Sequence, residues 1–331
     1  MRFLFKTSVT EASTNFDDRL ARLGIITAAN INQRNRRINV LSICGPLVGA
    51  VVAVASISKL GFTSETAEIL GSFFFLNILG IGIGLHRYFT HRSFKTSEVG
   101  RCLLGLFGSW SLQGPIARWV ADHRRHHRFA DQPLDPHSPY WIIDKPTAGI
   151  RGLWWSHFRW MLSGYATSET CYASDVLADP ITAIMSRYYW WFALSGLALP
   201  ALAGWIVGGE NEAIRSFLWA GCFRVFVLHH LTWSVNSIGH RFGSRVGNAS
   251  DQSRNNWMLG LLLLGEGFHS YHHKYGAAAV NRPCGRTCMA CSFCYLSVSA
   301  LYGRYVVIRT RTRKFTYIFC VYNDEQRILA Q

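Results

Sequence analysis

The chain is poor in charged residues, and especially in acidic ones. Only 16% of its 331 residues are charged, whereas hydrophobic residues make up 49%. Soluble domains contain roughly 25% charged residues, so this deficit favours a membrane protein. Lysine and arginine number 34 against 19 acidic residues, which gives a formal net charge of +15. Because the basic residues flank apolar runs, they fit positive-inside topology and anionic lipid headgroups better than a nucleic-acid partner.

The sequence also lacks a secretory signal and a dinucleotide-binding motif. Residues 1–20 contain no long apolar run, so we expect no cleaved signal peptide. No glycine-rich fingerprint follows a strand-like run, which disfavours a bound dinucleotide. The nine cysteines are scattered, and the first four stand far from one another. Such usage suits a reducing, cytosol-facing location.

Apolar runs divide the chain into membrane segments. The polar segment 1–37 ends in a basic cluster, which places it in the cytosol. The runs that follow are long enough, or nearly so, to cross a bilayer as helices, and they cover residues 38–58, 69–85, 188–209 and 216–238. Four crossings return the chain to the cytosol. We therefore expect an all-α integral membrane protein with both termini cytosolic.

Two other segments are not expected to cross the membrane. Residues 102–117 are apolar, but the run is only 16 residues long and contains Pro115. We expect a re-entrant or interfacial helix there. Residues 118–187 are polar and rich in tryptophan, and we interpret them as a cytosolic region.

Histidines are concentrated next to the apolar segments. Of the 13 histidines, nine fall into four clusters: His86, His91, His123, His126, His127, His240, His269, His272 and His273. Neutral imidazole is the commonest metal ligand in proteins, and nine imidazoles are about right for two ions. The sequence therefore predicts a two-metal centre on the cytosolic side. We expect structural roles for the remaining four, His137, His157, His229 and His230.

The spacing within each cluster indicates how the imidazoles are presented. His123, His126 and His127 lie at i, i+3 and i+4, which is one face of a helix, and the triplet that begins at His269 repeats this pattern. Each triplet can therefore present three imidazoles to one cavity. His86 and the next histidine are five residues apart, about 140° around an α-helix. We expect these two to serve different ions.

Polar residues near the clusters are candidates for supporting roles. Metal-bound imidazoles usually donate their other N–H group to a carboxylate or a carbonyl. We expect Asp122 and Glu266 to accept such bonds, whereas Asp131 and Asp135 could equally be loop charges. Asn236, one helical turn before the third cluster, is expected to hold a metal-bound water. Imidazole suits iron, zinc, copper and nickel. An all-imidazole set of nine favours a pair of iron ions that activate O2, but the sequence leaves zinc open.

These motifs carry a family resemblance. The segments GLHRYFTHRSF, WVADHRRHHRFADQPLDPHSP, TWSVNSIGHRFG and GEGFHSYHH resemble the histidine boxes of the membrane fatty acyl desaturases, and most of all those of the stearoyl-CoA (delta-9) group. The resemblance extends from roughly residue 38 to 275, with the boxes in order and suitably separated. Several residues that flank the boxes also fit the family: Arg87, Asn236, Ser237, Gly265, Glu266 and Gly267.

The resemblance implies a fold and a reaction. It implies four transmembrane helices under a cytosolic helical cap, and a di-iron centre held by the nine histidines, with Asn236 contributing through water. The implied reaction uses O2 to remove two hydrogens from adjacent methylenes of a saturated acyl chain, which yields a cis double bond and two waters. An apolar tunnel would position the chain. The expected substrate is acyl-CoA, desaturated at the delta-9 position, with acyl-lipid as the next candidate.

Electrons must come from another protein. The HPGG signature of an attached cytochrome b5 domain is absent from the sequence. We therefore expect a separate cytochrome b5 or ferredoxin with its reductase. The other expected partners are membrane lipid and the acyl substrate, and no nucleic acid is expected.

The resemblance fades after Tyr275. The expected domains are thus a cytosolic segment 1–37, a membrane desaturase domain 38–275 and a divergent basic tail 276–331. The tail contains closely spaced cysteines, and a thiolate site for iron–sulfur or zinc is one interpretation: Cys284, Cys288, Cys291 and Cys294. We favour the other interpretation, a tail altered by a disrupted reading frame, which translation of the coding DNA in the other two frames would test.

Two alternatives to desaturation remain open on the sequence. A related di-iron hydroxylase or alkane monooxygenase would use the same oxidant to insert oxygen. A non-catalytic membrane metal-binding or transport protein belongs to a different class. Transporters place ionisable residues near the membrane midplane, whereas these histidines lie at the ends of the apolar runs. The residues flanking the histidines favour desaturation.

Overall fold

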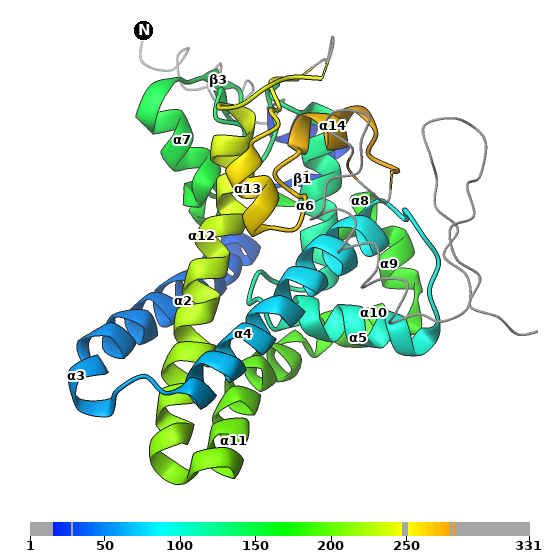
Figure 1. Cartoon of the computed structure of the whole chain (residues 1–331). Coiled ribbons are helices and arrows are strands. Elements are labelled where there is room, and N and C mark those ends of the chain that lie inside the picture. The colour runs from blue at the N-terminus through cyan, green and yellow to red at the C-terminus, as the bar shows by residue number, and fades with distance from the viewer. Residues whose placement is uncertain (1–15, 28, 247–250, 279–280, 282–331) are drawn as a thin grey trace, which may run out of the picture.

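The computed structural model describes residues 16–27, 29–246, 251–278 and 281 (Figure 1). The tail cysteines and the expectations made for the tail lie outside these residues. The described part is mostly helical. Its longest helical segments are α2 (Ala29–Ala55), α4 (Ser64–Ile78), η1 (Leu79–Thr90), α11 (Tyr189–Ser216), η3 (Phe217–Phe223) and α12 (Arg224–Ser237).

Three helical stretches are long and apolar enough to cross a membrane, within the described residues. They cover Asn35–Ala55, Ser64–Thr90 and Tyr189–His240. The first two correspond to the expected runs 38–58 and 69–85. Their lipid-facing character is evident in α2, where Leu41, Val48 and Val51 are each at least 60% exposed. The chain is therefore a membrane protein, and the apolar side chains exposed on its long helices are available to contact lipid.

The third stretch has 52 residues and reverses direction near its middle. Gly208 departs from helical geometry, and Gly209 has a φ of +70°, a left-handed conformation that glycine adopts at little cost. Beyond this turn, the buried Arg224 donates a hydrogen bond to the carbonyl of Gly196 at 2.7 Å. Residues on either side of the turn are thus in contact, and the two expected runs 188–209 and 216–238 pack as an antiparallel hairpin.

Shorter elements gather at one end of the long helices, as Figure 1 shows. The helices of this group are α6 (Ile116–Phe129), α7 (Gly149–His157), α8 (Glu169–Tyr172), α9 (Ser174–Ala178), α10 (Pro180–Arg187), α13 (Trp257–Leu262) and α14 (His269–Lys274). Two short 3₁₀ turns follow α7 and α12 respectively: η2 (Arg159–Leu162) and η4 (Ile238–His240). Two antiparallel strand pairs complete the group: β1 (Ile25–Ile26) with β4 (Ala166–Thr167), and β2 (Trp141–Ile142) with β3 (Lys145–Pro146).

The helix α5 (Glu98–Ser109) packs closely against η1. A Cβ atom on Gly80 would come within 2.2 Å of the carbonyl carbon of Phe107, so only glycine permits this approach. Asn77 strengthens the contact by donating to the Phe107 carbonyl at 2.7 Å. With 12 residues, α5 is about 18 Å long, too short to cross a bilayer. It holds η1, and with it the first histidines, in place.

Candidate metal centre

The nine clustered histidines come together in two adjacent sets. The first set contains His86, His91, His123, His127 and His272, and the second contains His126, His240, His269 and His273. Within each set, one ring nitrogen from every residue lies within 4.8 Å of all the others. The sets touch each other, since the rings of His127 and His273 are stacked with centroids 4.5 Å apart. Four segments that are distant in the sequence thus meet at one place.

His86 and His91 lie in the same set, which differs from the expectation that they serve different ions. The reason is the local helix type. The segment η1 is a π-helix, in which residue i+5 returns to the face of residue i. The amide of His91 accordingly bonds to the carbonyl of His86 at 3.2 Å. The angle of about 140° applies to an α-helix and does not hold here.

Each histidine triplet is divided between the two sets. On α6, His123 and His127 belong to the first set and His126 to the second. On α14 the division is reversed, because only His272 belongs to the first set. Residues i and i+4 are about 40° apart around a helix, whereas i+3 and i+4 differ by about 100°. Each helix therefore contributes to both sets, where the sequence indicated only a shared cavity.

The inward-facing nitrogens have the character of metal ligands. The Nε2 atom of His272 lies 3.0 Å from that of His86 and 2.9 Å from that of His127. Burial and neighbouring imidazoles hold the pKa of His126 and of His272 well below the usual value, so both rings are neutral. The buried Nε2 of His91 has no hydrogen-bond partner among the described residues. Converging neutral imidazoles fit a pair of cations.

Carboxylates engage the outward-facing nitrogens. The Nδ1 atom of His126 contacts both carboxylate oxygens of Asp135 at 3.0 Å. Other acids make the same kind of contact with three more histidines: Asp131 with His240 at 2.8 Å, Asp251 with His273 at 2.9 Å, and Glu266 with His86. An imidazole that donates from Nδ1 keeps its Nε2 lone pair free for a metal.

Glu266 also holds the buried Arg87, which donates from Nη2 at 2.6 Å. Burial alone would raise the pKa of Glu266, but His86 and Arg87 lower it to about 2. The carboxyl group is therefore ionised, as a hydrogen-bond acceptor for His86 requires.

Asp122 is placed differently from the expectation. Its carboxylate accepts a hydrogen bond from Thr167 and lies 3.8 Å from Arg118, and within the described residues it bonds to no histidine. The Nδ1 atom of His126, one helical turn away, is already taken by Asp135. Asp251, by contrast, was missed by sequence reasoning. It lies in a polar loop 22 residues before His273, and no local spacing signals the contact.

The four remaining histidines lie outside both sets. His229 donates to the carbonyl of Ser111 at 2.7 Å, and His157 contacts both Ser237 and His230 at 3.0 Å. These contacts fit structural roles. His137 lies closer to the centre than the sequence indicated, since its ring is 4.2 Å from that of His126 and it groups with Asp135.

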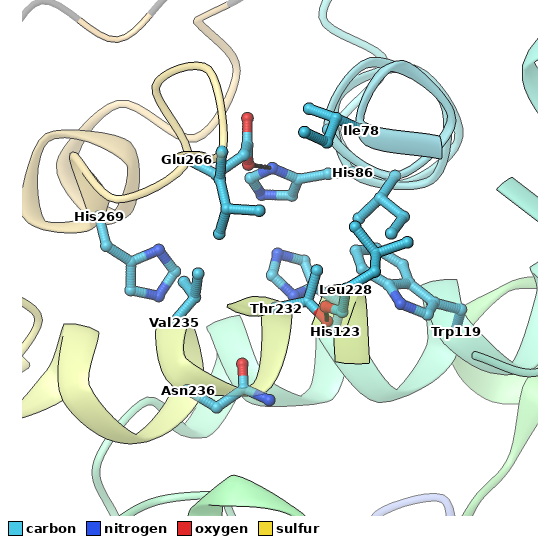
Figure 2. A pocket seen from close by; sticks show the side chains of 13 residues that line it. Ile78, His86, Trp119, His123, Leu228, Thr232, Val235, Asn236, Glu266 and His269 are labelled. Carbon is cyan, nitrogen blue, oxygen red and sulfur yellow. Dashed lines mark hydrogen bonds and ion pairs between the residues drawn. The ribbon is translucent and has the colours of Figure 1, made fainter. Parts of the chain in front are cut away.

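A cavity opens beside the histidines. Figure 2 shows His86, His123 and His269 around a common space, with Asn236 across it from Glu266. Asn236 lies on α12, four residues before His240, and its side chain lines the cavity. The ring of Trp119 is stacked on that of His123, with centroids 5.1 Å apart, and fixes its orientation.

Arg124 ties the first and second histidine boxes together. Its guanidinium donates to the carbonyls of Phe89 and Thr90, just before His91, and to both carboxylate oxygens of Asp175 on α9. Burial alone would raise the pKa of Asp175, but its bonds to Arg124 and Arg92 lower it to about 2. This acid thus holds the end of η1 against α6.

We expect Asp175→Asn to lower stability by about 1 kcal/mol, because it removes a charged acceptor for two arginines while the group stays partly exposed. The thermal unfolding of the detergent-solubilised protein measures the change. Glu98→Gln is the matched control, because Glu98 is 82% exposed and its contact with Arg101 is long, at 3.8 Å, and therefore weak. Equal shifts in the two variants would contradict the role given to Asp175.

Comparisons with known proteins agree with the geometry. The sequence model of the family "Fatty acid desaturase" matches residues 67–282. The chain is 35% identical over 237 residues to a hex-5-enoyl-[acyl-carrier protein] acetylenase of Moorena producens, an alignment covering 71% of this chain and 74% of that protein. It is 35% identical over 205 residues to an sn-1 stearoyl-lipid 9-desaturase of Anabaena variabilis, covering 61% and 68%.

A mammalian relative extends the similarity. The chain is 31% identical over 208 residues to stearoyl-CoA desaturase 5 of Bos taurus, covering 61% of this chain and 59% of that protein. The span matched by the family model contains all four histidine clusters. With its apolar helices and its converging imidazoles, the chain belongs to the fatty acid desaturase family of membrane oxidoreductases that act on fatty acyl chains.

Proposed function

We propose that this protein uses O2 and two iron ions to introduce a cis double bond into a saturated fatty acyl chain. The observation that carries the proposal is the pair of converging imidazole sets beside an apolar cavity. We propose acyl-CoA as the first candidate carrier and the delta-9 position as the site. The Anabaena variabilis relative is a 9-desaturase, which supports the position, and the Bos taurus relative is a stearoyl-CoA desaturase, which supports the carrier.

The cavity has the lining that an acyl chain needs. Its walls include Ile78 and Ile81 from the α4–η1 helix, Leu228 and Val235 from α12, and Leu263 after α13. Apolar walls exclude water and favour methylenes over polar groups. Because His86, His123 and His269 border the same space, a chain bound there passes directly beside the proposed iron pair.

A second, more polar cavity continues the first. The two share the residues Trp119, His123, Thr232 and Asn236, and the second also reaches Arg118. Where they meet, Gln113 donates to Thr232 at 2.8 Å and accepts from the indole N–H of Trp119 at 3.3 Å. We take the polar cavity as the mouth, where the basic Arg118 suits an anionic carrier. The Gln113 bridge fixes the path of the chain between mouth and interior.

The chemistry divides between the iron pair and the protein. Iron supplies the oxidising power toward an unactivated methylene, which no side chain has. The acyl chain loses two hydrogens, O2 takes them up together with two electrons and two protons, and two waters leave. The electrons come from cytochrome b5 or ferredoxin with its reductase. Glu266, Asp131, Asp135 and Asp251 accept the Nδ1 protons of their histidines, which leaves the Nε2 lone pairs directed at the site of the proposed iron pair. The cavity holds two adjacent methylenes in reach.

We also propose a topology of four membrane crossings with the termini and the histidines on the cytosolic side. The reversal at Gly209 supports four crossings, and the basic residues of α2 that precede Ile38 support the orientation. Membrane-impermeant maleimide applied to sealed vesicles tests it. The exposed Cys171 should react only from the cytosolic side, and reaction from the opposite side alone would refute the topology.

Ile78 is expected to limit chain length. It lies eight residues before His86 and lines the apolar cavity. We expect Ile78→Ala to raise the ratio of longer to shorter products by about tenfold, a discrimination that one methylene in an apolar pocket can provide. Gas chromatography of products from mixed saturated substrates measures the ratio. An unchanged ratio with retained activity would exclude Ile78 from the chain-binding wall.

The test of the function itself is lipid profiling of cells that express the chain, with double-bond positions determined. New cis-monounsaturated chains support desaturation. Hydroxylated chains instead would overturn it in favour of the related hydroxylase. Metal analysis of the purified protein accompanies the profile, since zinc in place of iron would contradict the proposed cofactor.

A further inference from the structure

The helix α13 exposes an apolar face outside the spanning helices. Trp257, Met258 and Leu261 are 60%, 63% and 71% exposed, and Leu262 lies beside them. Their spacing of i, i+1, i+4 and i+5 places them on one side of the helix. Phe242, also exposed, adjoins this face, because its carbonyl is within 3.5 Å of the side-chain nitrogen of Asn256. A contiguous apolar surface of this kind in water would be costly and marks a site of contact.

The opposite side of the same segment closes the acyl cavity. Leu259 and Leu263 are buried, and Leu263 lines the cavity together with Ile78 and Val235. Adjacent residues, Leu262 and Leu263, therefore face the outside and the cavity respectively. In this region, the segment of α13 and Leu263 separates the acyl cavity from the outer surface of the protein.

The position of α13 along α12 indicates what that surrounding is. The two helices are in contact, and α12 belongs to the apolar stretch that ends at His240. The helix α7 also packs against α12, and it exposes Ile150 (81%) and Trp154 (56%). Tryptophan is enriched where a membrane meets water. Two helices beside the same end of α12 thus present exposed tryptophan and aliphatic side chains.

Basic residues accompany both apolar faces. Arg151 follows Ile150 and is exposed, as is Arg159 just beyond α7. Arg241 precedes Phe242 and stacks on Tyr140, with its guanidinium carbon 5.1 Å from the ring. Arginines next to exposed tryptophans suit a surface of anionic headgroups above acyl chains. The positive charge of these arginines complements the anionic headgroups of a lipid leaflet, whereas an apolar protein surface would leave it unpaired.

We propose that the outer face of α13, formed by Trp257, Met258, Leu261 and Leu262, inserts among the lipid acyl chains of the leaflet beside the histidines. The inserted face anchors the segment that leads directly into Glu266 and the three histidines of α14. The height of these ligands relative to the bilayer is thus set by α13 as well as by the spanning helices. The proposal concerns membrane contact and stands independently of the reaction catalysed.

Photocrosslinking in intact membranes tests this contact. A benzophenone amino acid is placed at Leu261 in the full chain, and the matched control carries it at Thr170, which is exposed on α8. After irradiation, mass spectrometry should find phospholipid adducts at Leu261 and none at Thr170. If the probe at Leu261 prevents accumulation of the protein, Met258 on the same face takes its place. Adducts to another protein, or equal lipid capture at both positions, would overturn the proposal.

Discussion

Replacement of His272 by alanine is expected to reduce product formation by more than about a hundredfold. Loss of a residue that only hydrogen-bonds to a metal ligand lowers activity by about 10–100-fold, and loss of the ligand itself should cost more. His272 is the only residue of α14 in the first set, and its Nε2 atom lies between those of His86 and His127. Its loss opens one of the two proposed ion sites. Metal analysis should find one ion per chain in place of two, with membrane insertion unchanged.

A paired variant shows whether the two sets act separately. His126 belongs to the second set, so His126→Ala should also abolish turnover and should leave the first set loaded. His157→Ala is the control, since this histidine contacts Ser237 and His230 outside both sets. It should keep two ions and most of the activity. Full activity in His126→Ala or in His272→Ala would refute the ligand assignment.

The histidine pattern predicts which residues form the two sets, because these histidines recur at helical spacing in the sequence. The HxxHH motifs at His123 and His269 predict a face of imidazoles on any α-helix. What spacing could not predict is how two such helices meet. The division of each triplet between two sets follows from how the side chains of α6 and α14 meet, as in the contacts of His126 with His273 and of His127 with His272, and this is tertiary information.

Two features escaped the sequence for physical reasons. The π-helical geometry of η1 places His86 and His91 together, and no residue type in LGIGIGLHRYFT specifies a π-helix over an α-helix. Asp251 reaches His273 from a loop, so its role depends on chain folding and not on spacing. The expected apolar runs overlap the three helical stretches that are long and apolar enough to cross a membrane, because run length and composition can be read from the sequence. The left-handed Gly209 marks the turn between the last two runs.

Glu266→Gln is expected to weaken metal binding by about 10–100-fold, the usual contribution of an acid that orients a ligating imidazole. The neutral amide is a weaker acceptor for the Nδ1 proton of His86, and the substitution removes the negative partner of the buried Arg87. Breaking a buried ion pair costs about 3–5 kcal/mol, so the unfolding temperature should fall as well. Titration of the metal-free protein with ferrous ion measures affinity, and a thermal scan measures stability.

Asp122→Asn tests whether an acid must hydrogen-bond to a histidine ligand to affect metal binding, or whether it is enough to lie near one. Asp122 adjoins His123 in the sequence, yet its carboxylate engages Thr167 and Arg118. The variant should therefore bind metal as tightly as the unaltered protein, while any change in substrate affinity would reflect its place in the polar mouth. If Asp122→Asn and Glu266→Gln weaken metal binding equally, the general negative charge near the imidazoles is what matters. A difference of tenfold or more, about 1.4 kcal/mol, would instead place the effect in the specific contact between Glu266 and His86.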